Sequence, residues 1–277
     1  MSIEVKDLSF CYNRGTSLVK HAIDNISFSV GKGEFVLIGG EVGCGKSTLA
    51  RLLTGLLSPR CGSVTIDGKA AGSRKVRSKA GLLMQHPQKQ LFGRTVYEDV
   101  AFAPSNFGFK GKELDEHVMY ALGLVGLDRS VASLSPFALS GGEMRLVSLA
   151  GVLAMKPDYL ILDEPGSGLD PHNRSMLTRT LGKLHSSGIS IVVVSHQLSE
   201  MLAFAEKIII LKSGSIGFLG SVREYLRSDT FTLPDITFLM KELNLAGIDI
   251  ADDIYSVDGA FSEIIRFFGS TEVRPDE

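Results

Sequence analysis

The sequence has no excess of positive charge. It contains 29 lysines and arginines against 31 aspartates and glutamates, which gives a formal net charge of −2 at pH 7. Proteins that bind nucleic acid or anionic lipid through their overall charge are basic, because the phosphates that they neutralise are negative. The composition therefore argues against a general nucleic-acid binder, and we expect no nucleic-acid partner.

Long apolar runs are also missing. The longest stretches, such as residues 189–194 and 208–211, are much shorter than the ~20 apolar residues that a membrane-spanning helix needs. The first residues, MSIEVK, lack the basic start and apolar middle of a secretory signal peptide. We therefore expect no membrane span and a location in the cytosol.

Cysteine is scarce, and the sequence contains only Cys11, Cys44 and Cys61. An odd number of cysteines without C-x-x-C spacing argues against a disulfide framework and against a zinc site. We expect all three thiols to be reduced.

The remaining composition is typical of a globular protein. Hydrophobic residues make up 44% of the chain and charged residues 22%, which lies outside the range of disordered chains. The length of 277 residues suits one large domain with a small appendage, which we expect at residues 1–220 and 221–277. The 30 glycines exceed the usual share of ~7%, which points to loops that cradle phosphate.

Two patterns of apolar residues predict two kinds of sheet. Four short runs are almost continuously apolar, as expected for strands covered on both faces: residues 34–38, 81–84, 159–162 and 189–194. Three earlier runs alternate more loosely between glycine turns, as in an antiparallel layer: residues 3–10, 26–30 and 63–67. The fold class is therefore predicted to be α/β.

Helical patterns replace the strands in two regions. Residues 95–154 contain helical segments at about 96–102, 113–124 and 143–154, separated by prolines and glycines, which predicts a helical insertion. After Gly220 two amphipathic stretches remain: residues 235–245 and 257–268. They predict a small C-terminal helical unit, which could either mediate dimerisation or cover the sheet.

A glycine loop carries the most specific motif. Residues 40–47 fit G-x-x-x-x-G-K-[ST], between the predicted strand 35–38 and a helical run at 48–57. The glycines let backbone N–H groups turn toward phosphate, and the helix start adds partial positive charge. We expect Lys46 to bind the β- and γ-phosphates and Ser47 to bind Mg²⁺. The predicted ATP-binding residues of the loop are Gly40, Gly43, Cys44, Gly45, Lys46, Ser47 and Thr48. The alternative is a plain glycine-rich turn.

Polar residues follow three other predicted strands. Strand 159–162 ends in Asp163, a candidate Mg²⁺ ligand, and Glu164, a candidate to orient and polarise the water that attacks the γ-phosphate. Gln85 could reach Mg²⁺ or this water, and His196 the γ-phosphate. Ligands of parallel sheets bind beyond the carboxyl ends of the strands, so these residues should share one edge with the glycine loop. Individually, an acidic loop or a turn residue would explain each of them.

The segment LSGGE at 139–143 precedes the helical run 144–154. A capping serine and two glycines at a helix start favour a second phosphate contact. No lysine accompanies it, so in isolation it would be an ordinary helix cap.

The order of these motifs resembles that of ATP-binding cassette (ABC) ATPases over about residues 3–227. The resemblance implies a P-loop NTPase core with an antiparallel β subdomain, a helical ABC-specific subdomain and a small C-terminal helical extension. It implies that ATP and Mg²⁺ are the cofactors, that Tyr12 stacks on adenine, and that Asp170 lies in a loop crossing a dimer interface. It also implies that one subunit's signature closes on the nucleotide of the other. The signature residues are Leu139, Ser140, Gly141, Gly142 and Glu143.

A finer resemblance is to energy-coupling-factor (ECF) importers of vitamins and transition-metal ions. It is based on residues 85–92, 95–102, 135–137 and 150–154. It implies an ATP-hydrolysing subunit at the cytoplasmic face of the membrane, whose partners are a second ATPase and integral membrane and substrate-binding subunits. Leu91, Phe92 and the segment after Thr95 match the positions that receive a membrane subunit's coupling helices, although ordinary packing would also explain them.

Several residues depart from the family pattern. Glu143 replaces the usual glutamine, Leu146 a common arginine and Gly166 a common threonine or serine, and Glu41 is an acid that must face solvent to avoid repelling phosphate. The variant signature and the methionine that follows it resemble the second of two paralogous ATPases, which favours a heterodimer over a homodimer.

The alternatives are the ATPase of another ABC transporter class, a soluble ABC protein of translation or DNA maintenance, and a GTPase that uses the D-x-x-G match at 163–166. Against the GTPase, the sequence has no N-K-x-D motif. The transported solute stays open.

Overall fold

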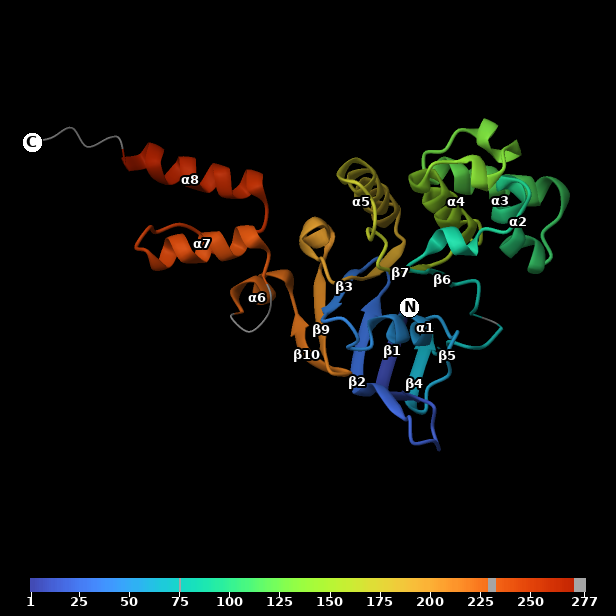
Figure 1. The fold of residues 1–277 in the computed structure, drawn as a ribbon, viewed down its shortest axis with the longest axis horizontal. Helices are drawn as coiled ribbons and strands as arrows, with labels where there is room; N and C mark the ends of the chain where they lie inside the picture. Colours follow the sequence, from blue (N-terminus) through green and yellow to red (C-terminus); the bar gives the residue numbers. More distant parts are fainter. Residues whose placement is uncertain (75, 229–232, 272–277) are drawn as a thin grey trace, which may run out of the picture.

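The computed structural model describes residues 1–74, 76–228 and 233–271. A six-stranded sheet and a four-stranded sheet form the body, a group of helices lies at one end, and a helical hairpin extends from the other (Figure 1). The chain is therefore α/β with two sheet types, as the apolar patterns predicted.

The six-stranded sheet has the order β10-β9-β3-β8-β7-β6. Its pairs are parallel except that β10 runs antiparallel to β9. The strands are β3 (Phe35–Gly40), β6 (Ala80–Leu83), β7 (Tyr159–Asp163), β8 (Ser190–Val194), β9 (Lys207–Lys212) and β10 (Ser215–Gly220). The four predicted parallel strands thus lie within a few residues of their observed bounds.

Both faces of this sheet are buried, which explains its continuous apolar runs. Because side chains alternate across a strand, Leu37 and Val193 join one core cluster, whereas Val36 and Val192 join another. The first cluster contains residues of the helical insertion and of α5 (Pro171–Ser186), and the second contains α1 (Lys46–Leu53) and the antiparallel sheet. The central strands therefore hold the two halves of the body together.

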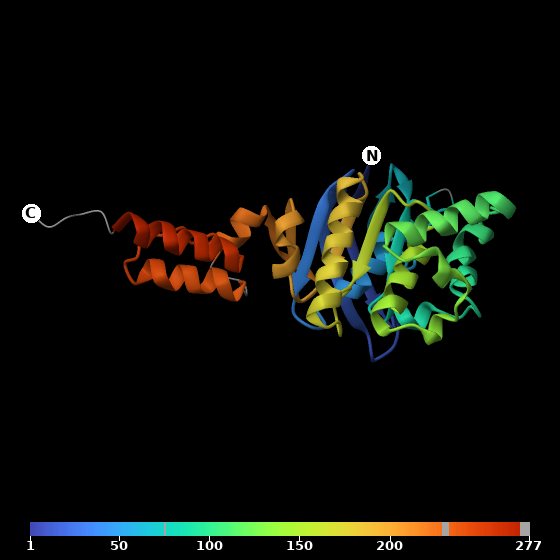
Figure 2. The same ribbon diagram turned by 90° about the horizontal axis from the view of Figure 1, so that it is seen from above.

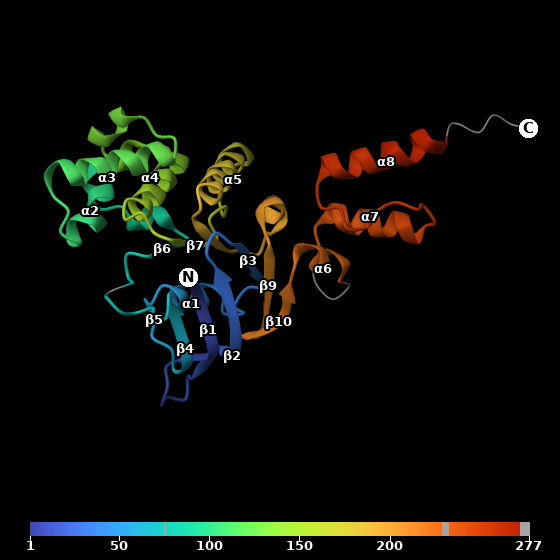
Figure 3. The same ribbon diagram turned by 180° about the vertical axis from the view of Figure 1, so that it is seen from behind.

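The four-stranded sheet has the order β2-β1-β4-β5 and is antiparallel throughout. Its strands are β1 (Ser2–Tyr12), β2 (Lys20–Gly31), β4 (Cys61–Ile66) and β5 (Lys69–Ala70). Ile3 of β1 pairs with Val30 and with Ile66, and all three side chains are buried in the cluster that contains α1. This sheet lies beneath the central sheet in Figure 3.

The insertion contains α2 (Val96–Asn106), α3 (Gly111–Leu124) and α4 (Gly141–Leu153), which pack on one another at one end of the body (Figure 1). Thr95 begins α2 by accepting a hydrogen bond from the Glu98 amide at 3.2 Å. The helix continues four residues beyond the predicted end and contains Pro104, which has no N–H to donate to the carbonyl four residues earlier.

The C-terminal residues form a short helix and a hairpin. Helix α6 (Val222–Arg227) packs at the β9–β10 edge, and α7 (Asp235–Leu245) and α8 (Val257–Thr271) project away from the body (Figures 1 and 2). The hairpin has its own apolar centre at Met240, Ile250 and Ala260. Among the described residues it therefore stands off the sheet rather than covering it. Residues 229–232 and 272–277 of the expected C-terminal unit lie outside the described residues.

The hairpin is joined to α6 by ionic contacts. Arg223 and Arg227 both pair with Asp253, at 3.1 and 3.3 Å, in the segment between α7 and α8. Within the described ranges, no helix combines the length and the apolar character that a membrane span requires.

The central sheet should dominate the stability of the body. Replacing the fully buried Leu37 by alanine is expected to lower the free energy of unfolding by about 2–5 kcal/mol, because it leaves a cavity between close-packed layers. Leu245, which is 81% exposed on the hairpin, is the control, and its replacement by alanine should change stability by less than about 0.5 kcal/mol. Denaturant unfolding measures both, and equal losses would contradict the assignment of the core.

Candidate functional site

Four loops meet at the carboxyl edge of the six-stranded sheet. Val194 of β8 pairs in register with Ile38 of β3 and with Asp163 of β7. Leu83 of β6 pairs with Leu162 of β7. The residues that follow these strands therefore lie along one edge, as predicted: the glycine loop, Glu164, His196 and Gln85.

The glycine loop has a backbone that only glycine can adopt at two positions. Gly40 and Gly45 have φ angles of +138° and +107°. A β-carbon on Gly40 would lie 2.3 Å from the Leu211 carbonyl oxygen, and one on Gly45 would lie 2.2 Å from the Ala22 carbonyl oxygen. Close packing against neighbouring backbone thus fixes the path of the loop.

Helix α1 starts without a cap. Gly45 is its N-cap residue, no side chain accepts from its first N–H groups, and its first turn contains no acid. The N–H groups and the positive end of the helix are therefore available to an anion. The Lys46 ammonium, on a side chain only 7% exposed, donates to the carbonyl oxygens of Gly40 at 2.7 Å and Glu41 at 2.9 Å. The buried Lys46 ammonium next to the uncapped start of α1 suits a phosphate.

The other loop residues surround this centre. Cys44 is buried, and burial raises the pKa of its thiol, which keeps the thiol neutral beside Lys46. The side chain of Glu41 is exposed, as its charge requires. Tyr12 and Thr48 share a hydrogen bond of 3.1 Å between their hydroxyls. This bond places the Tyr12 ring beside the start of α1, although 36 residues separate the two in sequence.

Ser47 and Asp163 form an oxygen pair suited to Mg²⁺. The Ser47 hydroxyl donates to Asp163 Oδ1 at 3.0 Å. Burial raises the pKa of Asp163, although the hydrogen bond from Ser47 acts in the opposite direction. A bound cation would therefore stabilise the Asp163 carboxylate. Hydroxyl and carboxylate oxygens are the hard donors that Mg²⁺ prefers, so these residues fit the ion. Gln85 is exposed at the bend that follows β6.

Glu164 is held by three hydrogen bonds. Its carboxylate accepts from the Ser195 hydroxyl at 3.1 Å, from the His196 amide at 3.1 Å and from His196 Nδ1 at 2.9 Å. Its backbone has a left-handed φ of +50°, and its amide donates to the Val194 carbonyl oxygen at 2.8 Å. A non-glycine residue in this conformation is strained by about 1–2 kcal/mol, which the surrounding bonds must offset. The Glu164 carboxylate is therefore held in one position at the sheet edge.

The signature segment and the Asp170 loop lie side by side. Ser140 caps α4 and, with Glu143, forms a reciprocal capping box. A β-carbon on Gly142 would lie 2.7 Å from the side-chain oxygen of Asn173. Asn173 in turn donates to Asp170 from its backbone amide at 3.0 Å and from its side chain at 2.5 Å. Leu139 is half-buried against the first core cluster, and Gly141 is exposed at the start of the helix.

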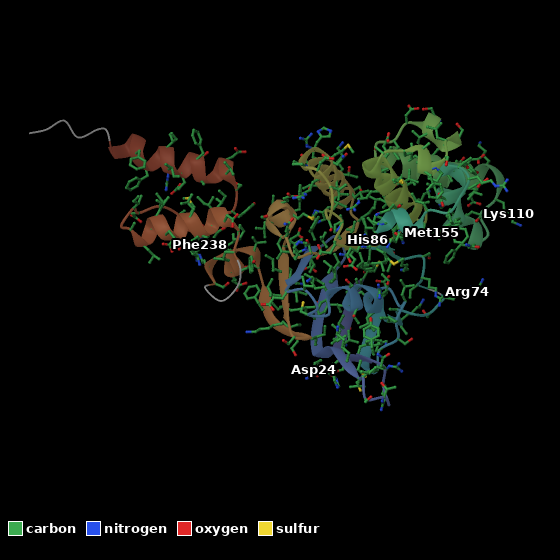
Figure 4. All side chains as sticks on the ribbon, viewed as in Figure 1. Asp24, Arg74, His86, Lys110, Met155 and Phe238 are labelled. Atoms are coloured by element: carbon green, nitrogen blue, oxygen red, sulfur yellow. The ribbon has the colours of Figure 1, made fainter. Side chains whose placement is uncertain are left out.

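The segment after Gln85 corrects one prediction. Leu91 is buried in the first core cluster, so it offers no surface to a partner, whereas Phe92 is exposed. Both were expected at this surface because they match the positions that receive coupling helices in the importers that the sequence resembles. Figure 4 labels His86, next to Gln85, at the junction between the sheet and the helical insertion.

Arg145 is a site residue that the sequence analysis missed. It is buried in α4 and donates through Nη1 to the Pro165 carbonyl and through Nη2 to the Ser167 carbonyl at 2.8 Å. It thus joins the signature helix to the loop that follows Glu164. The sequence did contain a signal for this residue, because Arg145 directly precedes the largely apolar run 146–150 of a predicted helix. An arginine buried in such a helix needs hydrogen-bond acceptors from another part of the fold.

Comparison with known proteins gives the family. A family model described as ABC transporter matches residues 23–167. The chain belongs to the ABC transporter family. This cassette is 44% identical over 266 residues to an ABC transporter ATP-binding protein of Methanosarcina acetivorans, covering 96% of this chain and 94% of that one. It is 39% identical to the energy-coupling factor transporter ATP-binding protein EcfA2 of Caldanaerobacter subterraneus, covering 98% and 99% of the two chains.

Solved structures agree with this assignment. CbiO1 of Clostridium perfringens, described as part of the ABC transporter complex cbiONQ, is 31% identical with a TM-score of 0.73, covering 88% of this chain and 94% of that one. A dimeric, post-hydrolysis ATP-binding cassette bound to ADP and Pi is 29% identical with a TM-score of 0.71, covering 80% and 99%. The cassette is therefore an ABC ATPase, and ATP is its nucleotide.

Arg145 should contribute measurably to stability. Its replacement by leucine leaves the buried Pro165 carbonyl and the partly buried Ser167 carbonyl without this donor and is expected to lower the free energy of unfolding by about 2–4 kcal/mol. The control is Arg179→Leu, which removes an exposed arginine from α5 and should cost less than about 0.5 kcal/mol. Denaturant unfolding distinguishes the two, and a neutral Arg145→Leu variant would show that α4 is not tied to the loop by this side chain.

Proposed function

We propose that this chain is the ATP-hydrolysing subunit of an ECF-type importer, which couples ATP-driven closure of an ATPase dimer to uptake of a vitamin or transition-metal ion through separate membrane subunits. The observation that carries the proposal is the common sheet edge that holds the uncapped loop at Lys46, the Ser47–Asp163 pair and the Glu164–His196 pair. The ECF assignment is supported by full-length relatives named as ECF ATP-binding proteins and by the likeness to CbiO1.

The nucleotide lies along the glycine loop in this proposal. The backbone N–H groups of residues 40–48 and the Lys46 ammonium bind the phosphates, and the Tyr12 ring packs on adenine. Ser47, Asp163 and Gln85 hold Mg²⁺, which neutralises charge on the phosphate oxygens when bound. The Ser47–Asp163 and Tyr12–Thr48 hydrogen bonds support these roles, because both place their side chains at the start of α1.

Glu164 acts as the general base. Its carboxylate orients a water and accepts a proton from it as the water oxygen attacks the γ-phosphorus and the bond to the ADP oxygen breaks. Ser195 and the His196 amide prevent the carboxylate from rotating away. His196, whose side chain is half exposed, contacts the γ-phosphate from the neighbouring strand end.

Glu164→Gln should slow ATP hydrolysis by roughly 10²- to 10⁴-fold, because an amide cannot accept the proton, while the phosphate cradle is unchanged. Turnover is measured by phosphate release, and binding by titration with a fluorescent ATP analogue. Near-normal turnover in this variant would exclude the assigned role of Glu164.

Lys46→Ala should affect nucleotide binding, which Glu164→Gln should not. It removes the ammonium from the cradle and should weaken nucleotide binding, whereas Glu164→Gln should leave binding intact. If both variants bound ATP as the unaltered chain does, the loop would not be the phosphate site.

The second ATPase subunit completes each site. The signature residues and Asp170 form one continuous surface through Asn173, and we propose that this surface meets the nucleotide and loop of a partner. A dimeric cassette among the structural neighbours supports this arrangement. We propose a paralogous partner, hence a heterodimer.

Membrane subunits dock on an exposed aromatic pair, Phe92 of the segment after Gln85 and Phe102 of α2. Phe92 and Phe102 are 62% and 50% exposed, and their rings meet edge to face at 4.7 Å. Asp99 Oδ1 accepts from the amides of Phe92 and Gly93, both at 2.9 Å, so this segment is anchored to α2. In this arrangement the subunit lies peripherally at the cytoplasmic face of the cell membrane.

Affinity purification from native membranes in mild detergent tests the transport assignment. The unaltered chain should copurify with integral membrane proteins, and the Phe92→Ser, Phe102→Ser double variant should lose them. Phe238→Ser, which alters a comparably exposed phenylalanine on α7, is the control and should retain them. Recovery of no membrane protein with the unaltered chain would instead favour a soluble ABC ATPase.

A further inference from the structure

Arg174 of α5 connects the two segments that follow Glu164 and His196. Its Nη2 donates to the Leu169 carbonyl at 3.2 Å, in the loop that follows Glu164. Its Nη1 donates to Glu200 Oε1 at 3.1 Å, in the segment that follows His196. One guanidinium therefore contacts both segments beside the Glu164–His196 pair.

The Glu164 carboxylate is joined to the second of these segments at its other end. The Ser195 hydroxyl donates to Glu164 Oε2 at 3.1 Å and accepts from the Gln197 amide at 3.0 Å. Residues 195–200 thus contact the carboxylate at one end and Arg174 at the other. A change at Arg174 can therefore reach the carboxylate, although in the described part of the chain no hydrogen bond joins the two side chains directly.

The two segments leave a small gap beside Glu164. A cavity of about 20 Å³ lies between them, and its lining includes Glu164 and Gly166 of the first segment, Ser195 and His196 of the second, and Arg174. A cavity of this size can hold about one water molecule. At this point the two segments are therefore bridged by polar links such as the Arg174 fork rather than by close apolar contact.

One nitrogen of the Arg174 guanidinium has room for a further acceptor. Arg174 Nε is buried and has no hydrogen-bond partner among the described residues. A β-carbon on Gly166 would lie 4.0 Å from this nitrogen and 3.7 Å from Arg174 Cγ, which are ordinary contact distances, and the φ angle of Gly166 is not left-handed. A serine at this position would fit and would place a hydroxyl within reach of Nε. Because an unpaired buried donor is unfavourable, such an acceptor should strengthen the contact.

We infer, building on the proposed function, that Arg174 is a positioning residue for ATP hydrolysis. It holds the loop after Glu164 against the segment after His196 and so keeps the carboxylate in place, and an acceptor at residue 166 would tighten its hold. Arg174 acts through Glu200 and the loop rather than on the nucleotide. It should therefore affect the rate of hydrolysis and leave ATP affinity unchanged, because the phosphate cradle belongs to another loop.

The first test is turnover of the complex that copurifies with the full chain from native membranes. Phosphate release is measured as the part that Glu164→Gln abolishes, which separates this site from that of a partner. Arg174→Met keeps an aliphatic stem beside Gly166 and removes the donors, so it should lower this turnover about tenfold with the KM for ATP within about twofold. The control is Arg179→Met, which removes an exposed arginine from the same helix and should leave turnover within about twofold.

Glu200→Ala tests the same link from its exposed end. The Glu200 side chain is 44% exposed, so its loss should not impair folding. Turnover should fall by about threefold, because one of the two contacts of Arg174 is lost. The Arg174→Met, Glu200→Ala double variant should be no slower than Arg174→Met alone, since both changes break one link.

Thermal unfolding of the full chain tests the acceptor position at residue 166. Gly166→Ser and Gly166→Ala add the same β-carbon, but only serine adds an acceptor. The serine variant should unfold about 2–4 °C above the alanine variant. This difference should disappear when Arg174→Met is added to both.

The outcomes separate this inference from the proposed function. Turnover within about twofold of the unaltered complex in Arg174→Met overturns the inference, and so does a parallel loss of ATP affinity, which would indicate a general structural effect. Equal unfolding midpoints for serine and alanine at residue 166, or a serine gain that persists without Arg174, overturn it as well. If the unaltered complex releases no phosphate or binds no fluorescent ATP analogue, the proposed function itself fails.

Discussion

The parallel pairing of β3, β8 and β7 determines where every reactive group lies. The Ser195 amide donates to the Ile38 carbonyl at 3.0 Å, and the Glu164 amide donates to the Val194 carbonyl at 2.8 Å. These bonds extend the parallel hydrogen-bond pattern of the sheet by one residue beyond the strand ends, into the loops. A shift of one residue would turn every side chain to the opposite face, and the two apolar clusters forbid it. The geometry of the site therefore depends on ordinary aliphatic packing.

Much of this arrangement could be predicted from the sequence, because the spacing of apolar residues and the residue types in the loops are local properties. The glycine loop, the strand before Asp163 and the strand before His196 all lie where the apolar runs placed them. Strand β9 was not predicted, because a run of four apolar residues does not distinguish a strand from other buried segments. Helix α5 was missed as well, although Asp170 caps it and Pro171 begins it.

The contacts that complete the site could not be predicted, because they join residues far apart in the chain. Glu164 and His196 are 32 residues apart, and only the register of β7 with β8 brings them to hydrogen-bonding distance. Arg145 depends on carbonyl groups that exist as acceptors only once the loop after Glu164 is folded. The burial of Leu91 beside the exposed Phe92 likewise depends on the packing of the helical insertion.

The helical insertion is attached to the segment after Gln85 from two sides. Asp99 of α2 binds the amides of Phe92 and Gly93, and the Ser148 hydroxyl of α4 donates to the Pro87 carbonyl at 2.9 Å. Helix α4 also bears the signature at its N-terminus. The segment after Gln85 and the signature are therefore both attached to α4.

The separate apolar centre of the α7–α8 hairpin has an evolutionary consequence. Its buried residues Met240, Ile250 and Ala260 belong to the hairpin alone, and it is attached to the body through Asp253, which pairs with two arginines of α6, and through Leu233 and Tyr255 at its base. Outward-facing residues such as Phe261 and Ile265 can therefore diversify without disturbing the chemistry at the sheet edge. Copies of the gene that arise by duplication can therefore differ on the surface of the α7–α8 hairpin and keep the same nucleotide site.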